Sequence, residues 1–195
     1  LIRLVGVDVW TLSMWRGLLL AIVLGLAQLL RHRGRIVSVY RDLGWRGLLA
    51  GGLWGIGTLF FVAAVTHTTA ANVLIIIGAT PLVAALLGRT FLGEHVPIHT
   101  WIAIAGAVGG IALTVAGSIE GPRSGDLFAL CAVLFLSAYL TTVRGAGDVD
   151  MTPCVVISGL VAATLSFPLA QPGSIPIDGI LPLLLLCVVV IPLSF

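Results

Sequence analysis

The chain has 195 residues, of which 59% are hydrophobic and only 9% are charged, and its formal net charge is +2. Soluble globular domains are about 45–50% apolar and about 25% charged, so this composition excludes a soluble domain and indicates an integral membrane protein. With so little net charge and no stretch of alternating basic and aromatic residues, we expect no nucleic-acid partner.

Apolar runs close to the roughly 20 residues needed to cross a bilayer recur along the chain. They are separated by short connections rich in Gly, Pro and charge. The pattern predicts an all-α polytopic transmembrane helix bundle and excludes an outer-membrane barrel, whose strands are about 10 residues long with alternating polarity. The seven predicted helices cover residues 9–30, 45–66, 70–91, 101–117, 125–143, 153–169 and 179–195.

Arginine supplies all ten basic side chains, and its distribution orients the bundle through the positive-inside rule. If the connection after the first helix is cytoplasmic, seven arginines lie on that side, against Arg3 and Arg123 outside. The seven are Arg31, Arg33, Arg35, Arg41, Arg46, Arg89 and Arg144. Trp45 and Trp101 begin helices at the same face, where aromatic belts are expected.

The first two helices contain a deep cation and a set of regularly spaced glycines. Arg16 lies about 10 Å into the first helix at about 1.5 Å per residue, and it either snorkels outward or holds an anionic group in a cavity. In the second helix Gly47, Gly51 and Gly55 recur every four residues, and Gly106 and Gly110 repeat that spacing further on. This pattern favours close helix packing, with a sliding face for alternating access as the alternative.

The helix at 70–91 carries residues that a simple membrane span does not need. Asn72 near its start either caps the helix or hydrogen-bonds an adjacent one. Pro81 removes the backbone hydrogen bond to the carbonyl of Ile77, with flexible Gly78 alongside, so we expect a kink. Transporters place substrates at such interruptions, and the kink is therefore either structural or part of a substrate site.

Trp54, Tyr139 and Thr141 lie inside helices and offer an apolar wall with polar tips to a small ligand, although most such aromatics only pack. Asp126 lies at the start of the helix at 125–143, and we expect its carboxylate to interact favourably with the positive N-terminal end of the helix dipole. No Asp or Glu falls deep inside a predicted helix, so the sequence gives no support for proton coupling.

Enzymatic and metal chemistry lack their sequence signals. The H-E-x-x-H motif and a complete nucleophile turn are missing. Three cysteines lie in apolar runs without metal-ligand spacing, namely Cys131, Cys154 and Cys187. We therefore predict no enzyme, no cofactor and no metal.

A weak internal similarity relates the first and sixth predicted helices: "DVWTLSM" and "LAQLL" are echoed by "DVDMTPC" and "LAQPG". Helices five apart cross the membrane in opposite directions, as in the inverted repeats of many secondary transporters.

A longer pattern resembles a known family. The stretch "TTAANVLIIIGATPLVAALLGRTFLGEHVPIHTWIAIAGAVGGIALTVAG" is similar to the second half of an EamA domain of the drug/metabolite transporter superfamily, and "GDLFALCAVLFLSAYLTTVRG" resembles the opening helix of a second copy. The matching features are Ala70, Ala71, Asn72, Pro81, Leu92, Gly93, Glu94, Trp101, Gly106 and Gly110.

The resemblance implies ten helices in two inverted five-helix repeats. Residues 1–119 would then be most of the first repeat, and 120–195 the beginning of the second. We expect one helix missing upstream and two downstream, which would explain why both ends of the chain look cut.

The implied function is secondary transport of a small metabolite, amino acid or drug-like compound across a prokaryotic inner membrane. The predicted substrate-cavity residues are Arg16, Trp54, Asn72, Pro81, Tyr139 and Thr141. The expected partners are the lipid bilayer and a small-molecule substrate, with a homodimer left open. The alternative is a non-catalytic membrane subunit or channel scaffold that acts with a partner.

Overall fold

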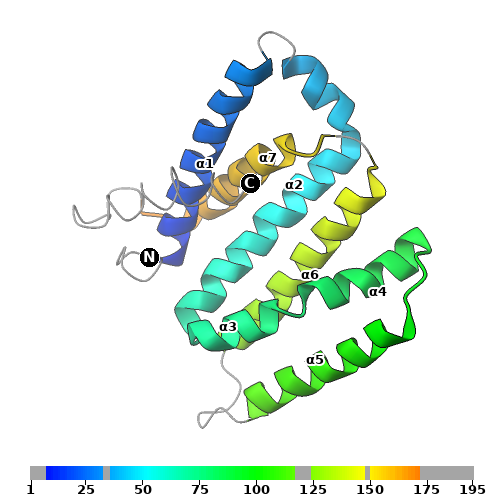
Figure 1. Cartoon of the computed structure of the whole chain (residues 1–195). Helices are drawn as coiled ribbons and strands as arrows, with labels where there is room; N and C mark the ends of the chain where they lie inside the picture. The colour runs from blue at the N-terminus through cyan, green and yellow to red at the C-terminus, as the bar shows by residue number, and fades with distance from the viewer. Residues whose placement is uncertain (1–7, 33–35, 117–123, 148–149, 172–195) are drawn as a thin grey trace. The chain divides into compact units, whose positions relative to one another are not determined.

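The computed structural model describes residues 8–32, 36–116, 124–147 and 150–171, and in these ranges every regular element is a helix (Figure 1). The elements are α1 (Val9–His32), α2 (Ile36–His67), α3 (Ala70–Ile77), α4 (Thr80–Leu92), α5 (Ile98–Ala116), α6 (Ser124–Gly145), α7 (Pro153–Ser166) and the 3-10 turn η2 (Phe167–Leu169). The predicted helix at 179–195 lies outside the described residues.

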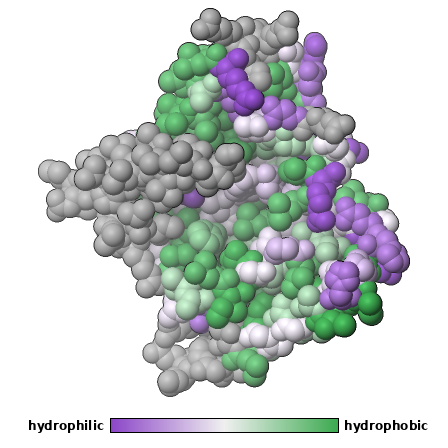
Figure 2. Space-filling model, in the orientation of Figure 1, coloured by the Kyte–Doolittle hydropathy of each residue, from purple (hydrophilic) through white to green (hydrophobic). Residues whose placement is uncertain are grey.

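Four helical stretches in the described ranges are long and apolar enough to cross a membrane. They are Val9–Arg31, Ile36–His67, Ala70–Leu92 and Ser124–Gly145, and two shorter apolar helices cover Ile98–Leu113 and Pro153–Leu169. Hydrophobic residues occupy much of the coloured surface in Figure 2, and large ones such as Leu113 and Ile98 are about three-quarters exposed, at 76% and 75%. Lipid is the environment that suits such a surface, so the predicted all-α polytopic membrane bundle is confirmed.

Two compact units divide the chain by packing: Leu1–Ile56 with Ala146–Phe195, and Gly57–Gly145. In the first, α1 packs along α7, and in the second, α3 and α4 pack on α6, with α5 alongside (Figure 1). These boundaries fall inside α2 and directly after α6. They describe packing, and the expected repeat boundary between residues 119 and 120 stays a prediction.

Backbone-to-backbone contact joins α1 and α7 in the first unit. A Cβ added to Gly17 would lie 2.5 Å from the carbonyl oxygen of Gly159, and one added to Gly159 would lie 2.6 Å from that of Gly17. Ala21 and Ala163, four residues further along each helix, adjoin the same crossing. Small residues at this spacing let helix backbones approach closely in a membrane.

The packing role predicted for the glycines of the second helix is confirmed at two positions. A Cβ on Gly51 would meet Ile157 at 2.6 Å, and one on Gly55 would meet the carbonyl oxygen of Ser158 at 2.7 Å, both in α7. At Gly106 and Gly110 of α5, an added Cβ meets no atom of the described chain within 4 Å. For α5 the packing role stays a prediction.

The start of the second helix was predicted wrongly. Helix α2 begins at Ile36, nine residues before the predicted start at Trp45, and it bends at Gly44, whose backbone is non-helical with φ 60° and ψ −165°. The segment before the bend is helical because it has tertiary anchors: Leu43 is 3% exposed, and the Tyr40 hydroxyl donates to Gln28 Oε1 of α1 at 3.1 Å. The predicted start therefore marks the bend within a longer helix.

The second unit has its own apolar core and a close contact at the start of α6. The core cluster consists of Ala64, Val73, Ile76, Ala129 and Val133. A Cβ on Gly125 would lie 2.6 Å from the backbone nitrogen of Thr68, so α6 begins directly against the turn between α2 and α3. Asp126 lies in the first turn of α6, as predicted, and is 2% exposed.

Candidate functional site

The span Ala70–Leu92 is interrupted in its middle. Helix α3 ends at Ile77 and α4 begins at Thr80, and between them the Ala79 N–H donates to Ile76 at 3.1 Å, three residues back rather than four. The predicted kink is thus confirmed, but Pro81 lies in the first turn of α4. Proline is well tolerated there because the N–H groups of a first turn have no acceptor within the helix.

Side-chain hydroxyls donate hydrogen bonds to backbone carbonyl oxygens around the interruption. The Thr80 hydroxyl donates to the carbonyl oxygen of Ile77 at 2.6 Å, which is the carbonyl that Pro81 cannot serve. The buried Ser137 hydroxyl of α6 donates in turn to the carbonyl oxygen of Thr80 at 2.9 Å. Since water does not reach lipid-facing backbone, such internal partners are what an interrupted span requires.

One face of α6 continues these contacts toward the far end of α4. The Thr141 hydroxyl donates to the carbonyl oxygens of Ala84 at 3.3 Å and Ser137 at 2.9 Å. Arg144 Nη2 donates to the same Ala84 oxygen at 2.8 Å. Residues 137, 141 and 144 follow the i, i+4, i+7 spacing of one helix face, so α6 is fastened to α4 over about two helical turns.

After α4, the chain folds back so that residues 93 and 94 hydrogen-bond to Gly88. Gly93 adopts the left-handed conformation with φ 68°, and its N–H bonds the carbonyl oxygen of Gly88, which also accepts from the Glu94 N–H at 3.3 Å. The Glu94 carboxylate occupies the space that a Cβ on Gly88 would fill. Gly88 and Gly93 therefore let Glu94 lie directly on the helix.

Glu94 then meets the end of α6. Its Oε2 lies 3.2 Å from Arg144 Nη1, and the two side chains are 38% and 42% exposed. Leu92 packs where Gly145 lacks a side chain, with 2.9 Å between its Cδ2 and an added Cβ. We name the contact of residues 92–94 with residues 144–145 the clasp.

Asn72 does not cap the helix, contrary to one of its two predicted roles. The cap of α3 is Thr69, whose hydroxyl oxygen accepts from the Asn72 backbone N–H at 3.3 Å. Thr69 is extended, with φ −71° and ψ 146°, which is the backbone that an N-cap requires. The Asn72 side chain is partly buried.

The other predicted cavity residues divide between the two units. Pro81 is exposed, Tyr139 is partly buried and Thr141 is 6% exposed, all within the second unit. Arg16 and Trp54 are partly buried in the first unit. The structure brings Thr141 against α4, the helix that has Pro81 in its first turn, through the Ala84 carbonyl.

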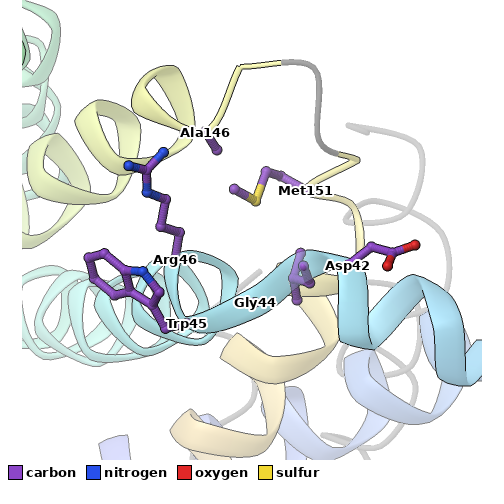
Figure 3. Close-up of a pocket in the computed structure, with 7 residues that line it drawn as sticks. Asp42, Gly44, Trp45, Arg46, Ala146 and Met151 are labelled. Atoms are coloured by element: carbon purple, nitrogen blue, oxygen red, sulfur yellow. The ribbon is translucent and has the colours of Figure 1, made fainter.

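A small cavity of about 190 Å³ opens at the bend of α2 (Figure 3). Its lining consists of Asp42, Leu43, Gly44, Trp45, Arg46, Ala146 and Met151. The Arg46 guanidinium lies over the Trp45 ring, 5.9 Å from its centroid, an arrangement typical of a membrane interface. Drug-sized ligands need about 300–1,000 Å³, and none of the six predicted cavity residues lines this space, so we do not identify it with the substrate site.

Sequence reasoning missed Thr80 and Ser137, and it interpreted Glu94 and Arg144 separately. The i, i+4, i+7 spacing of Ser137, Thr141 and Arg144 was a usable signal, since polar residues on one face of a membrane helix bind neighbouring helices. The pairing of Glu94 with Arg144 had no local signal, because 50 residues separate them.

A polytopic bundle of apolar helices defines an integral membrane protein, and an interrupted span is a feature that many secondary transporters share. The EamA-like transporter family model matches residues 2–116, more than half of the chain, and the chain belongs to this family, within the drug/metabolite transporter superfamily. Neither the curated proteins nor the solved structures give a match.

Members of this family are membrane transporters rather than enzymes. The protein is accordingly a multi-pass membrane transporter in contact with the lipid bilayer and a small-molecule substrate. In the part of the chain that the structure describes, no three His, Cys, Asp or Glu residues gather as a metal site.

Proposed function

We propose that the protein is a secondary transporter that moves a small metabolite, amino acid or drug-like compound across a prokaryotic inner membrane by alternating access. Residues 1–119 and 120–195 would belong to two inverted repeats of a ten-helix fold. The observation that carries this proposal is the interruption between α3 and α4, at the middle of a span-length segment.

The interruption has a packed side and an open side. Ala79 and Thr80 are buried, and Thr80 is fastened to α6 through Ser137. Gly78 and Pro81 are exposed. Irregular backbone is tolerated at membrane depth where it is packed in protein or lines a water-filled cavity, and we propose that the open side faces the substrate route.

Six side chains are the proposed cavity residues. Asn72 of α3 and Tyr139 of α6 are partly buried polar side chains, and Thr141 offers a hydroxyl that already holds α4. Arg16 and Trp54 would contribute a cation for an anionic group and an aromatic wall. Pro81 would act through the bend it helps to fix.

Transport by the full-length native chain in proteoliposomes tests this function. A panel of radiolabelled amino acids, sugar derivatives and drug-like cations is offered, and saturable accumulation above protein-free vesicles is expected for at least one solute. For that solute, Asn72→Ala and Arg16→Gln should raise KM, and Pro81→Ala should lower the transport rate without lowering insertion. Thr142→Val is the matched control, because the Thr142 hydroxyl bonds Ala138 within its own helix at 2.8 Å.

The proposal fails if folded, monodisperse protein moves no solute of the panel and no solute raises its melting temperature. The subunit or scaffold alternative would then be favoured, and co-purification with a defined partner would be its measurement. If transport occurs but Asn72→Ala, Arg16→Gln and Pro81→Ala match the wild type, the function stands and the proposed cavity is wrong.

A further inference from the structure

The α4–α6 pair is held by bonds of two kinds along its length. Near the interruption, the Ser137 and Thr141 hydroxyls bond main-chain oxygens and are themselves buried, at 0% and 6% exposure. At the other end, Glu94 and Arg144 form an ion pair that water reaches from the side. Alternating access, which this inference takes from the function proposed above, needs a gate at each membrane face, and the two ends of this pair differ in how easily they can separate.

The exposed end is the one that can part at little cost. An exposed ion pair contributes little because water solvates both charges almost as well once they separate. Breaking a buried pair would instead strand an uncompensated charge. With exposures of 38% and 42%, Glu94 and Arg144 each reach water without being moved.

The surroundings of Glu94 fit repeated opening and closing. Its carboxylate lies in the space left by Gly88, and the chain reaches it through Gly93 in a left-handed conformation. Leu92 rests on Gly145 without an interlocking side chain.

We propose that the clasp is a latch: the Glu94–Arg144 pair holds α4 and α6 together at one membrane face in the closed state. Its release opens that face as far as Ala84, while the Ser137–Thr80 bond acts as the pivot. By the arginine distribution this is the cytoplasmic face. Arg144 is thus a positioning residue, since it also holds the Ala84 carbonyl at 2.8 Å.

Accessibility of Ala84 reports the latch without any knowledge of the substrate. Ala84 is 2% exposed, and its carbonyl oxygen accepts hydrogen bonds from both Arg144 and Thr141. Ala84→Cys is made in the full-length chain after Cys131, Cys154 and Cys187 are changed to Ala, and is labelled with a membrane-impermeant thiol reagent in inside-out and right-side-out vesicles. Glu94→Gln and Arg144→Gln should each speed labelling about three- to tenfold from one side only, since an exposed pair shifts an equilibrium up to about fivefold and the Ala84 bond adds to it.

Two control variants test whether the change in labelling rate comes from the Glu94–Arg144 pair itself. Arg89→Gln removes a neighbouring exposed cation that lies over Trp101, 5.6 Å from its centroid, and leaves the clasp intact; labelling should keep its wild-type rate. The charge exchange Glu94→Arg with Arg144→Glu should return labelling toward that rate. If Ala84→Cys does not fold, hydrogen exchange of residues 93–97 and 144–147 in the native chain replaces it, with faster exchange expected in Glu94→Gln.

Equal labelling in wild type and both Gln variants, at equal melting temperature, would overturn the latch. So would faster labelling from both sides, or the same acceleration in Arg89→Gln. If both Gln variants speed labelling at position 84 but the protein transports no solute, the latch is supported and the proposed function is wrong. If the protein transports a solute but both Gln variants label position 84 at the wild-type rate, the function is supported and the latch is wrong.

Discussion

The hydroxyl of Thr80 lies 2.6 Å from the carbonyl oxygen of Ile77, an acceptor that loses its usual N–H donor because residue 81 is proline. The Thr80 side chain thus supplies the hydrogen bond that the following proline cannot donate. The Ile77 carbonyl therefore keeps a hydrogen-bond donor at membrane depth, where water cannot supply one.

Thr80→Val should therefore lower the free energy of unfolding by about 0.5–1.5 kcal/mol, and Pro81→Ala should remove most of that penalty, because the new N–H at residue 81 can bond Ile77 as in a regular helix. A double-mutant cycle on reconstituted protein, unfolded with denaturant, measures this coupling. If Thr80→Val costs the same with proline and with alanine at position 81, the two residues act independently.

Ser137→Ala and Thr141→Val remove the two hydroxyls that bond the backbone of α4. Each should cost about 0.6–1.7 kcal/mol of stability, the range for hydrogen bonds between membrane helices. Thr142→Val, one residue along but bonded within α6, should cost much less. The unfolding midpoint of each variant gives the comparison, and a Thr142→Val loss as large as that of Thr141→Val would contradict the special role of this face.

Gly17→Ala and Gly159→Ala should destabilise the α1–α7 pair. Each added methyl would meet a main-chain oxygen, 2.5 Å or 2.6 Å away, and main chain cannot rotate aside, so a cost of about 1–3 kcal/mol is expected. Gly52→Ala is the matched control, since an added Cβ there meets no described atom within 4 Å. It should be neutral or stabilise by about 0.5–1 kcal/mol. Thermal denaturation in detergent ranks the three, and the ranking fails if Gly52→Ala is the most damaging.

Gly44→Ala tests the bend of α2. Its φ of 60° with ψ −165° is a conformation open essentially to glycine alone, so a Cβ should cost about 1–3 kcal/mol, although it would have space. Gly106→Ala in α5 adds a methyl to a helix without such strain. If the two variants have the same unfolding midpoint, the bend at Gly44 is not a feature of the protein in the membrane.

Many helix ends followed from local chemistry. The predicted helices at 9–30, 125–143 and 153–169 lie within two residues of α1, α6 and α7 with η2 at both ends, because hydropathy and Gly or Pro punctuation act locally. The start of α2 was missed because Leu43 and Tyr40 are held by tertiary contacts that make a charged, connection-like stretch helical. The kink near Pro81 was predictable, but its repair by Thr80 and Ser137 was not.

The sequence by itself determined that the chain is a helical membrane protein, because the bilayer imposes one length and one polarity on every span. The glycine spacing and the LGE motif could also be recognised as special from sequence. Only the tertiary structure decided which segments meet. It determines the partner of each glycine, the pairing of Glu94 with Arg144 and the attachment of α4 to α6. In lipid, hydrophobicity does not choose between neighbouring helices, so close packing and hydrogen bonds between residues distant in sequence make that choice.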